Sequence, residues 1–157
     1  MKNIKNKGIS IVETLIVICI ISVVVAIIIP NLSEFRNQQV LKNTTEDVVS
    51  LINEARNNTI SSKNSNTYGV HFQSDRAILF SGLSFVPSVD NKQIDFDSAV
   101  LIPGTGGINL TGGGSDIIFN RITGDTVNNG TIVIQLTSDS SRQKIINVSI
   151  LGIISTN

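Results

Sequence analysis

The chain of 157 residues contains one cysteine, one histidine and no tryptophan. A disulfide needs two thiols, so Cys19 cannot form one within a single chain, and one cysteine with one histidine is too small a set for a zinc site. Basic and acidic side chains number 12 each, so the formal charge of zero indicates neither a basic nucleic-acid surface nor an acidic tail. The chain is long enough for one modest domain, which must be stabilised by packing alone.

One long apolar run lies near the N-terminus, from residue 9 to residue 29. Its polar residues are Ser10, Glu13, Thr14 and Ser22. About 20 apolar residues are enough to cross the hydrocarbon core of a membrane as a helix. The run is preceded by Lys2, Lys5 and Lys7. Because basic residues mark the cytoplasmic side, we predict a single-pass protein of the cytoplasmic membrane with its N-terminus inside and its C-terminal part exported.

A cleaved secretory signal peptide is the first alternative for this run. Signal peptides have an apolar core of about 7–15 residues that ends at a cleavage site of small residues. Here the run is longer, and the sequence Pro-Asn-Leu-Ser-Glu that follows at residues 30–34 contains no such site. A membrane-spanning helix segment over residues 9–30 is the better interpretation. It could also be an ordinary anchor whose N-terminus is never cut.

Glu13 is the unusual residue of the run, because a carboxylate inside a membrane is costly unless it is paired or reaches the headgroups. The stretch KGISIVETL, residues 7–15, resembles the processing site of type IV prepilins and of type II secretion pseudopilins. The resemblance implies that a prepilin peptidase cuts between Gly8 and Ile9, that residues 1–8 are a leader, and that Ile9 is then N-methylated. Ile9 stands where phenylalanine is usual in that family, and Ser10 where threonine is frequent.

The same resemblance implies roles for two further residues. In the assembled filament Glu13 would pair with the amino group of Ile9 on a neighbouring subunit, which offsets the desolvation cost of the carboxylate. Pro30 lies where that family commonly has a proline that kinks the helix, and a proline inside a helix removes one hydrogen bond. The partners implied are the peptidase, membrane lipid and other pilin or pseudopilin subunits.

Beyond the run, residues 31–62 are predicted to continue the helix as an amphipathic segment. Its apolar residues, mostly spaced by three, four or seven, are Leu32, Phe35, Val40, Leu41, Val48, Leu51, Ile52, Ala55 and Ile60. Short runs rich in Val, Ile and Phe then recur between turn residues from position 67 to the end. The predicted fold class is α+β, with a long N-terminal helix packed against a C-terminal antiparallel sheet or small β-sandwich over residues 67–157.

The segment IIFNRITGDTVNNGTIVIQL, residues 117–136, carries a second and looser resemblance. A strand ending in Phe, two glycine-containing turns and a second strand are similar to the C-terminal half of GspH-type minor pseudopilins and FimT-type minor pilins. Ala55-Arg56, followed by a polar stretch and a strand at residues 68–72, fits the same pattern. An ordinary hairpin with glycine turns remains the alternative.

Binding sites for metals, phosphates or substrates are weakly indicated. The glycines of residues 104–114 lack the Gly-Lys-Ser/Thr of a phosphate-binding loop, and His71 has no metal-spaced partner. Asp90, Asp95 and Asp97 would suit calcium, but an exposed strand edge is the better interpretation. No constellation of nucleophile and base is visible, so we expect a protein that is not an enzyme and has no cofactor.

Some FimT-type minor pilins take up DNA, so the basic residues of this chain are candidates for DNA contact. Without residues 1–8 the chain has nine basic and twelve acidic side chains. The weak candidates for DNA contact are Arg142 and Lys144, with Arg121 as a third. Gly152 is followed by isoleucines where DNA-binding relatives tend to carry arginine, so DNA is not an expected partner. We therefore expect a structural minor pilin or pseudopilin, with a pilus-tip binding module for DNA or surfaces as the alternative.

Overall fold

The computed structural model describes residues 8–157 and, for residues 28–31, the backbone only. The chain divides into two compact units, Met1–Arg36 and Asn37–Asn157. Lys2, Lys5 and Lys7, on which the predicted orientation in the membrane rests, lie outside the described residues. The two units are described separately below.

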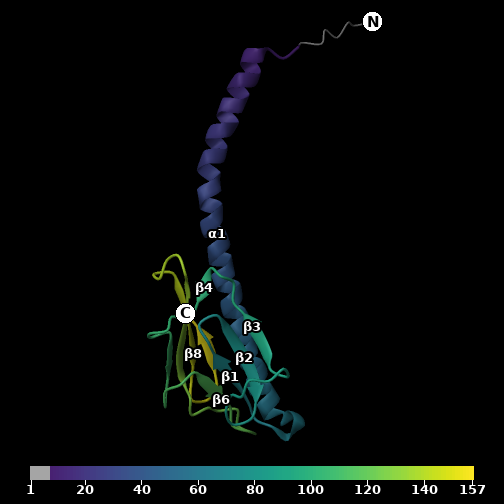
Figure 1. Ribbon diagram of the computed structural model, residues 1–157, viewed down its shortest axis with the longest axis vertical. Coiled ribbons are helices and arrows are strands. Elements are labelled where there is room, and N and C mark those ends of the chain that lie inside the picture. The colour runs from purple at the N-terminus through teal and green to yellow at the C-terminus, as the bar shows by residue number, and fades with distance from the viewer. Residues whose placement is uncertain (1–7) are drawn as a thin grey trace, which may run out of the picture. The chain divides into compact units, whose positions relative to one another are not determined.

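One helix, α1 (Ile11–Ile60), of 50 residues, contributes to both units (Figure 1). In the second unit its apolar side chains at Val48, Ile52 and Ala55 are fully buried, as the predicted stripe requires. Leu32 and Phe35, which the pattern assigns to the same stripe, are exposed in the first unit. The helix is followed by a short 3-10 helix, η1 (Lys63–Ser65).

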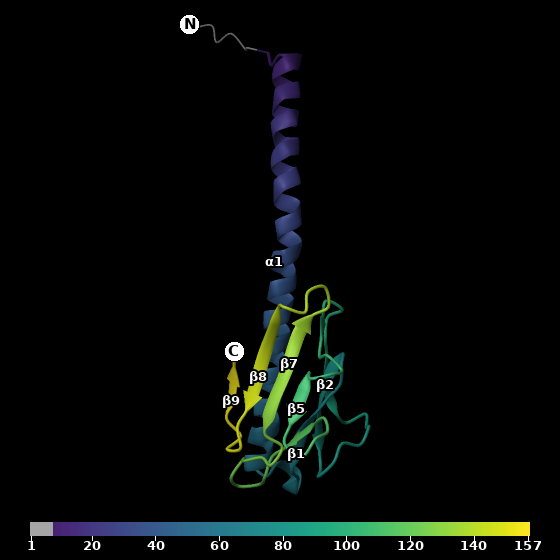
Figure 2. The same cartoon turned by 90° about the vertical axis from the view of Figure 1, so that its left-hand side faces the viewer.

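Nine strands follow, arranged in two antiparallel sheets. Their bounds are β1 (Tyr68–Phe72), β2 (Arg76–Ser81), β3 (Lys92–Asp95), β4 (Val100–Leu101), β5 (Ile108–Leu110), β6 (Asp116–Ile118), β7 (Gly130–Leu136), β8 (Gln143–Val148) and β9 (Ile154–Thr156). One sheet has the order β3-β2-β1-β6, and the other has the order β4-β7-β8-β9 with β5 also paired to β7 (Figure 2). The predicted α+β class, a long helix packed against antiparallel sheets, is confirmed.

The second unit has a single apolar core that α1 and both sheets share. Alternation along β7 buries Ile132, Ile134 and Leu136 on one face, as its sequence pattern predicts. These side chains join Val70 and Phe72 of β1 in the same core, so the two sheets and α1 bury their apolar faces together.

The last two strands differ from the prediction. The run rich in Val and Ile over residues 144–151 predicts one strand, but β8 ends at Val148 and the chain turns back through Gly152, whose φ of 71° suits a glycine. The turn is closed by the amide of Gly152, which donates to Ser149 O at 2.9 Å. Strand β9, too short to predict from periodicity, then pairs with β8. Ile150 and Leu151 are exposed in the turn because the strand ends before them.

The outer face of the first sheet carries a smaller aromatic cluster that sequence reasoning missed. The ring of Phe85, from the β2–β3 loop, stacks on His71 at 4.0 Å between centroids and meets the edge of Phe80 at 5.7 Å. His71 Nδ1 lies 2.5 Å from Asp116 Oδ1 on the neighbouring strand β6. The loop between β2 and β3 is therefore held against the sheet by one side chain.

Thr59 joins the end of α1 to the first strand. Its hydroxyl accepts a hydrogen bond from the amide of Tyr68 at 2.8 Å and donates to Ala55 O at 2.9 Å, and the residue is fully buried. A buried amide without a partner is costly, so this hydroxyl determines how the chain leaves the helix.

We predict that Thr59→Val lowers the free energy of unfolding of the second unit by about 1–3 kcal/mol, because the isosteric change leaves the amide of Tyr68 without an acceptor. Thermal and denaturant unfolding of the detergent-solubilised full chain, followed by circular dichroism, measures this. Thr59→Ser keeps the hydroxyl and is the matched control. Equal losses for both variants would show that the methyl group, not the hydrogen bond, matters.

Candidate functional site

The peptide bond between Gly8 and Ile9 lies immediately before the first helix. Residues 8–10 are outside any helix or strand, and α1 begins at Ile11. Gly8, Ile9 and Ser10 are all exposed, Ile9 at 78 %, and no atom lies within 4 Å of the place where a Cβ of Gly8 would be. The bond is therefore exposed and lies outside the helix, in the kind of backbone at which proteolytic cleavage concentrates.

Ser10 is the residue that starts the helix. Its hydroxyl oxygen accepts a hydrogen bond from the amide of Val12 at 3.3 Å, and its carbonyl accepts from the amide of Thr14 at 3.1 Å. This is an N-cap interaction, which satisfies one of the amides that have no partner in the first turn. Glu13 follows three residues after Ser10, the spacing of a capping box. Sequence reasoning missed this local role, although the Ser-x-x-Glu pattern could have predicted it.

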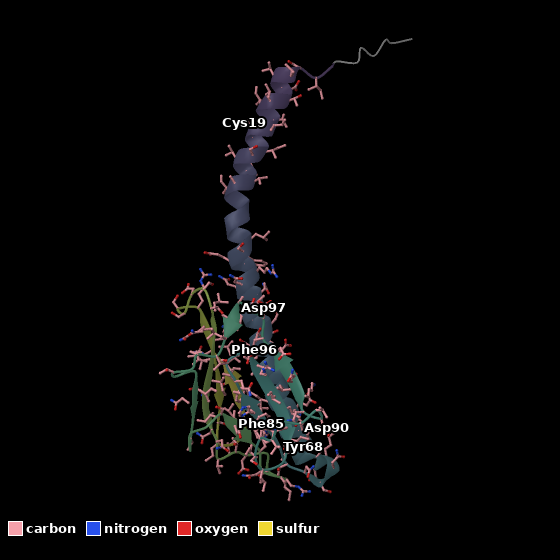
Figure 3. The ribbon with its side chains drawn as sticks, viewed as in Figure 1. Cys19, Tyr68, Phe85, Asp90, Phe96 and Asp97 are labelled. Carbon is pink, nitrogen blue, oxygen red and sulfur yellow. The ribbon has the colours of Figure 1, made fainter. Side chains whose placement is uncertain are left out.

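The apolar part of α1 has no protein covering it within the first unit. The side chains described from Ile11 to Ile27, including Glu13, are all exposed, and Figure 3 labels Cys19 among them. The helix is long and apolar enough to cross a membrane, with a mean hydropathy of 3.1 in its most apolar window. Such a surface needs lipid or other helices around it.

Pro30, the predicted helix kink, lies inside α1, and the helix continues through it from Ile11 to Ile60. The bend itself stays a prediction. Proline at this place removes one backbone hydrogen bond from the helix.

A groove lies in the second unit between α1 and the β8–β9 hairpin, with a volume of about 660 Å³. Two of the three basic candidates, Arg142 and Lys144, line it together with Lys42 of α1. Arg142 Nε is 3.3 Å from Asp139 Oδ2. The pKa of Asp139 is below its usual value, chiefly because the hydroxyl of Ser141 donates to it, and Arg142 adds to the effect. Part of the basic charge is therefore neutralised within the chain.

The third basic candidate, Arg121, lies elsewhere. It belongs to the loop between β6 and β7, whose Gly124 accepts a hydrogen bond at 3.0 Å from Arg56 Nε near the end of α1. Gly152 packs on the same place, since a Cβ there would lie 2.0 Å from Gly124 O. The structure thus brings Arg142 and Lys144 together and does not bring Arg121 to them.

Among the described residues, no group of three or more His, Cys, Asp and Glu side chains could hold a metal ion. Asp95 lies 3.7 Å from Arg76, and Asp97 accepts a hydrogen bond from the amide of Ala99 at 2.9 Å. His71 is enclosed by Phe85 and Asp116, as described above. Asp95, Asp97 and His71 therefore make contacts with other residues of the fold.

No family model, curated protein or solved structure matches the chain.

We predict that Ser10→Ala frays the first turn of α1, because an N-cap contributes about 0.5–2 kcal/mol. Hydrogen exchange of the amides of residues 11–14, in detergent, should become several-fold faster. Ser22→Ala is the matched control, since its hydroxyl bonds Ile18 O at 2.8 Å in the middle of the helix and caps nothing. Unchanged exchange in the Ser10 variant would mean that the hydroxyl does not stabilise the helix start.

Proposed function

We propose that this protein is a structural subunit of a filament of the type IV pilus or type II secretion kind, most similar to the GspH/FimT minor pseudopilins. A prepilin peptidase removes residues 1–8 on the cytoplasmic side, Ile9 is N-methylated, and α1 holds the subunit in the membrane before assembly. The β-rich unit is exported. The subunit has no catalytic role in this proposal.

The observation that carries the proposal is the position of one accessible bond relative to one charge. The bond between Gly8 and Ile9 lies in an exposed, non-helical stretch, two residues before α1 begins. Glu13 is the only charged residue from position 8 to position 33, and it lies in the first turn of the helix. A plain membrane anchor needs neither feature.

Assembly is favoured because an isolated first unit places the carboxylate of Glu13 in lipid, where its desolvation is costly. In lipid, Glu13 has one favourable neighbour, the positive end of its own helix. After cutting, Ile9 carries a new amino group, which can pair with Glu13 of another copy and offset the cost of placing both charges away from water. Filament formation would then cover the exposed apolar side chains of α1 with those of other subunits.

DNA uptake at a pilus tip is the second candidate, and the charges favour it less. In the groove, Lys42 lies 3.8 Å from Glu46, and Arg142 is paired with Asp139. A DNA site needs several basic side chains free to contact phosphates on one face. The isoleucines that follow Gly152 contribute no charge there.

The first experiment is intact mass and N-terminal sequencing of the protein from membranes of cells that express its own prepilin peptidase. We expect a chain that begins with N-methylated Ile9. A chain that still begins with Met1 would contradict the proposal and leave an ordinary anchored domain.

We predict that Glu13→Gln leaves this processing intact and lowers incorporation into filaments at least tenfold, because the amide cannot neutralise the amino group of Ile9. Sheared filaments are measured by immunoblot, with the membrane pool as reference. Glu34→Gln, the same change beyond the apolar run, is the matched control. Normal incorporation of the Glu13 variant would refute the assembly role of the charge.

A further inference from the structure

The exposed apolar side chains of the second unit gather in three loops. These loops are residues 82–91, 119–129 and 149–153, between β2 and β3, β6 and β7, and β8 and β9. Every large apolar side chain of this unit that is at least 60 % exposed lies in them. We call this set the end patch: Leu83, Val86, Val89, Ile122, Val127, Ile150, Leu151 and Ile153.

The three loops lie at one end of the unit, around the start of β1. Tyr68 is paired with Ser81, the last residue of β2, and its carbonyl accepts from the amide of Phe119 at 3.3 Å. The amide of Thr126 donates to Ile150 O at 2.9 Å, which joins the second loop to the third. In Figure 3, Phe85 and Asp90 of the first loop lie at the same end as Tyr68, and Phe96 and Asp97 lie at the other.

The loops at the opposite end of the strands are polar. Residues 73–75, between β1 and β2, are Gln-Ser-Asp, and residues 137–142, between β7 and β8, are Thr-Ser-Asp-Ser-Ser-Arg. Loops are normally polar because water covers them, so this end needs no explanation. The end patch is unusual for loops, because its eight side chains are apolar and expose on the order of 1,000 Å². This area is comparable to the roughly 800 Å² that each partner contributes to a standard protein interface.

The end patch is also held in place. Ile122 has a φ of 75°, a conformation that a β-branched residue rarely adopts, and its side chain is 84 % exposed. The surrounding turn maintains it, since the amides of Asn120 and Gly124 donate to Asp125 O and Asn120 O at 2.8 and 2.9 Å. This φ strains the backbone, and the exposed side chain of Ile122 contributes nothing to the core. A contact outside the subunit would give the strained turn a role.

The groove described above lies toward the polar end of the same unit. Leu41 and Val49 of α1 provide its apolar surface. Of its basic residues, Lys42 lies 3.8 Å from Glu46 and Arg142 pairs with Asp139, and Lys144 adds a further positive charge. The loops of the end patch carry three charged residues, Asp90, Arg121 and Asp125. Asp90 follows Val89, which is fully exposed, whereas the carboxylate of Asp125 accepts a hydrogen bond from the hydroxyl of Thr123. The opposite charges available to a contact between patch and groove are therefore Asp90 and Lys144.

We propose that the end patch of one copy docks into the groove of a second copy. Patch and groove lie at opposite ends of the unit, so the contact is head-to-tail and leaves one patch and one groove unoccupied at the two ends of any chain of copies. The inference rests on the proposed filament function.

A lipid surface is a poorer occupant of the end patch. Its eight side chains include no aromatic residue, whereas aromatic side chains mark membrane interfaces.

Crosslinking tests the contact directly, in membranes of cells that express the full chain and its peptidase. In a Cys19→Ser background, chains carrying both Ile122→Cys and Gln143→Cys, treated with a short bis-maleimide, should form dimers, trimers and higher multimers. Either cysteine alone should give no multimers beyond background. Ile122→Cys combined with Gln93→Cys, on the exposed edge strand β3, is the matched control. Dimers from Ile122→Cys alone, or equal multimers with the control pair, would overturn the proposal.

Charge exchange is the second test, with Val89→Cys and Gln143→Cys as the crosslinking pair. Lys144→Glu and Asp90→Lys should each reduce the multimers several-fold, and the two together should restore them, which a folding defect would not do. A double variant no better than Lys144→Glu would overturn the proposal. Ile122→Asn should also reduce multimers while keeping or raising the melting temperature, since asparagine tolerates this φ.

N-terminal sequencing of the same membranes separates the two proposals. If residues 1–8 are removed and no multimers form, the docking contact is wrong and the filament function stands. If residues 1–8 remain, the filament function is wrong whatever the crosslinks show.

Discussion

The constraint on which the rest depends is that α1 has two different environments along one continuous hydrogen-bonded helix. Up to Ile27 its described side chains are apolar and exposed, so they need lipid or other helices. From Leu41 onward one face is buried under two sheets. The sheets have no disulfide to stabilise them and share a single core with the helix. The second unit therefore depends on the same helix that provides the candidate membrane span.

Much of the fold could be predicted from periodicity. The stripe at Val48, Ile52 and Ala55 predicts the buried helix face, and the alternation in residues 131–136 predicts β7; both are confirmed. Strand β9 could not be predicted, because three residues carry no measurable period and its pairing with β8 is decided by the turn at Gly152. Nor could periodicity decide between the single sheet and the small β-sandwich that the sequence left open, since strand order depends on contacts far apart in the sequence.

The candidate site was predictable to a different degree in each part of the chain. The residues from Gly8 to Glu13 form a local pattern, so the sequence is sufficient to propose them, and the structure adds the N-cap at Ser10. The basic residues Arg142 and Lys144 are close in sequence and share a groove, but Lys42 joins them only through folding. The stacking of Phe85 on His71 likewise joins a loop to a strand, a contact that no periodicity encodes.

The shared helix also has a mechanical consequence. A force that pulls α1 by its N-terminal part is transmitted along the helix axis to Val48, Leu51 and Ile52, which are buried in the core. These side chains would have to slide past both sheets together, because they lie on one helix. Resistance to such shear is distributed over many contacts, whereas peeling breaks them one after another. The packing of α1 in the second unit thus resists a pull along the helix axis more than a pull across it.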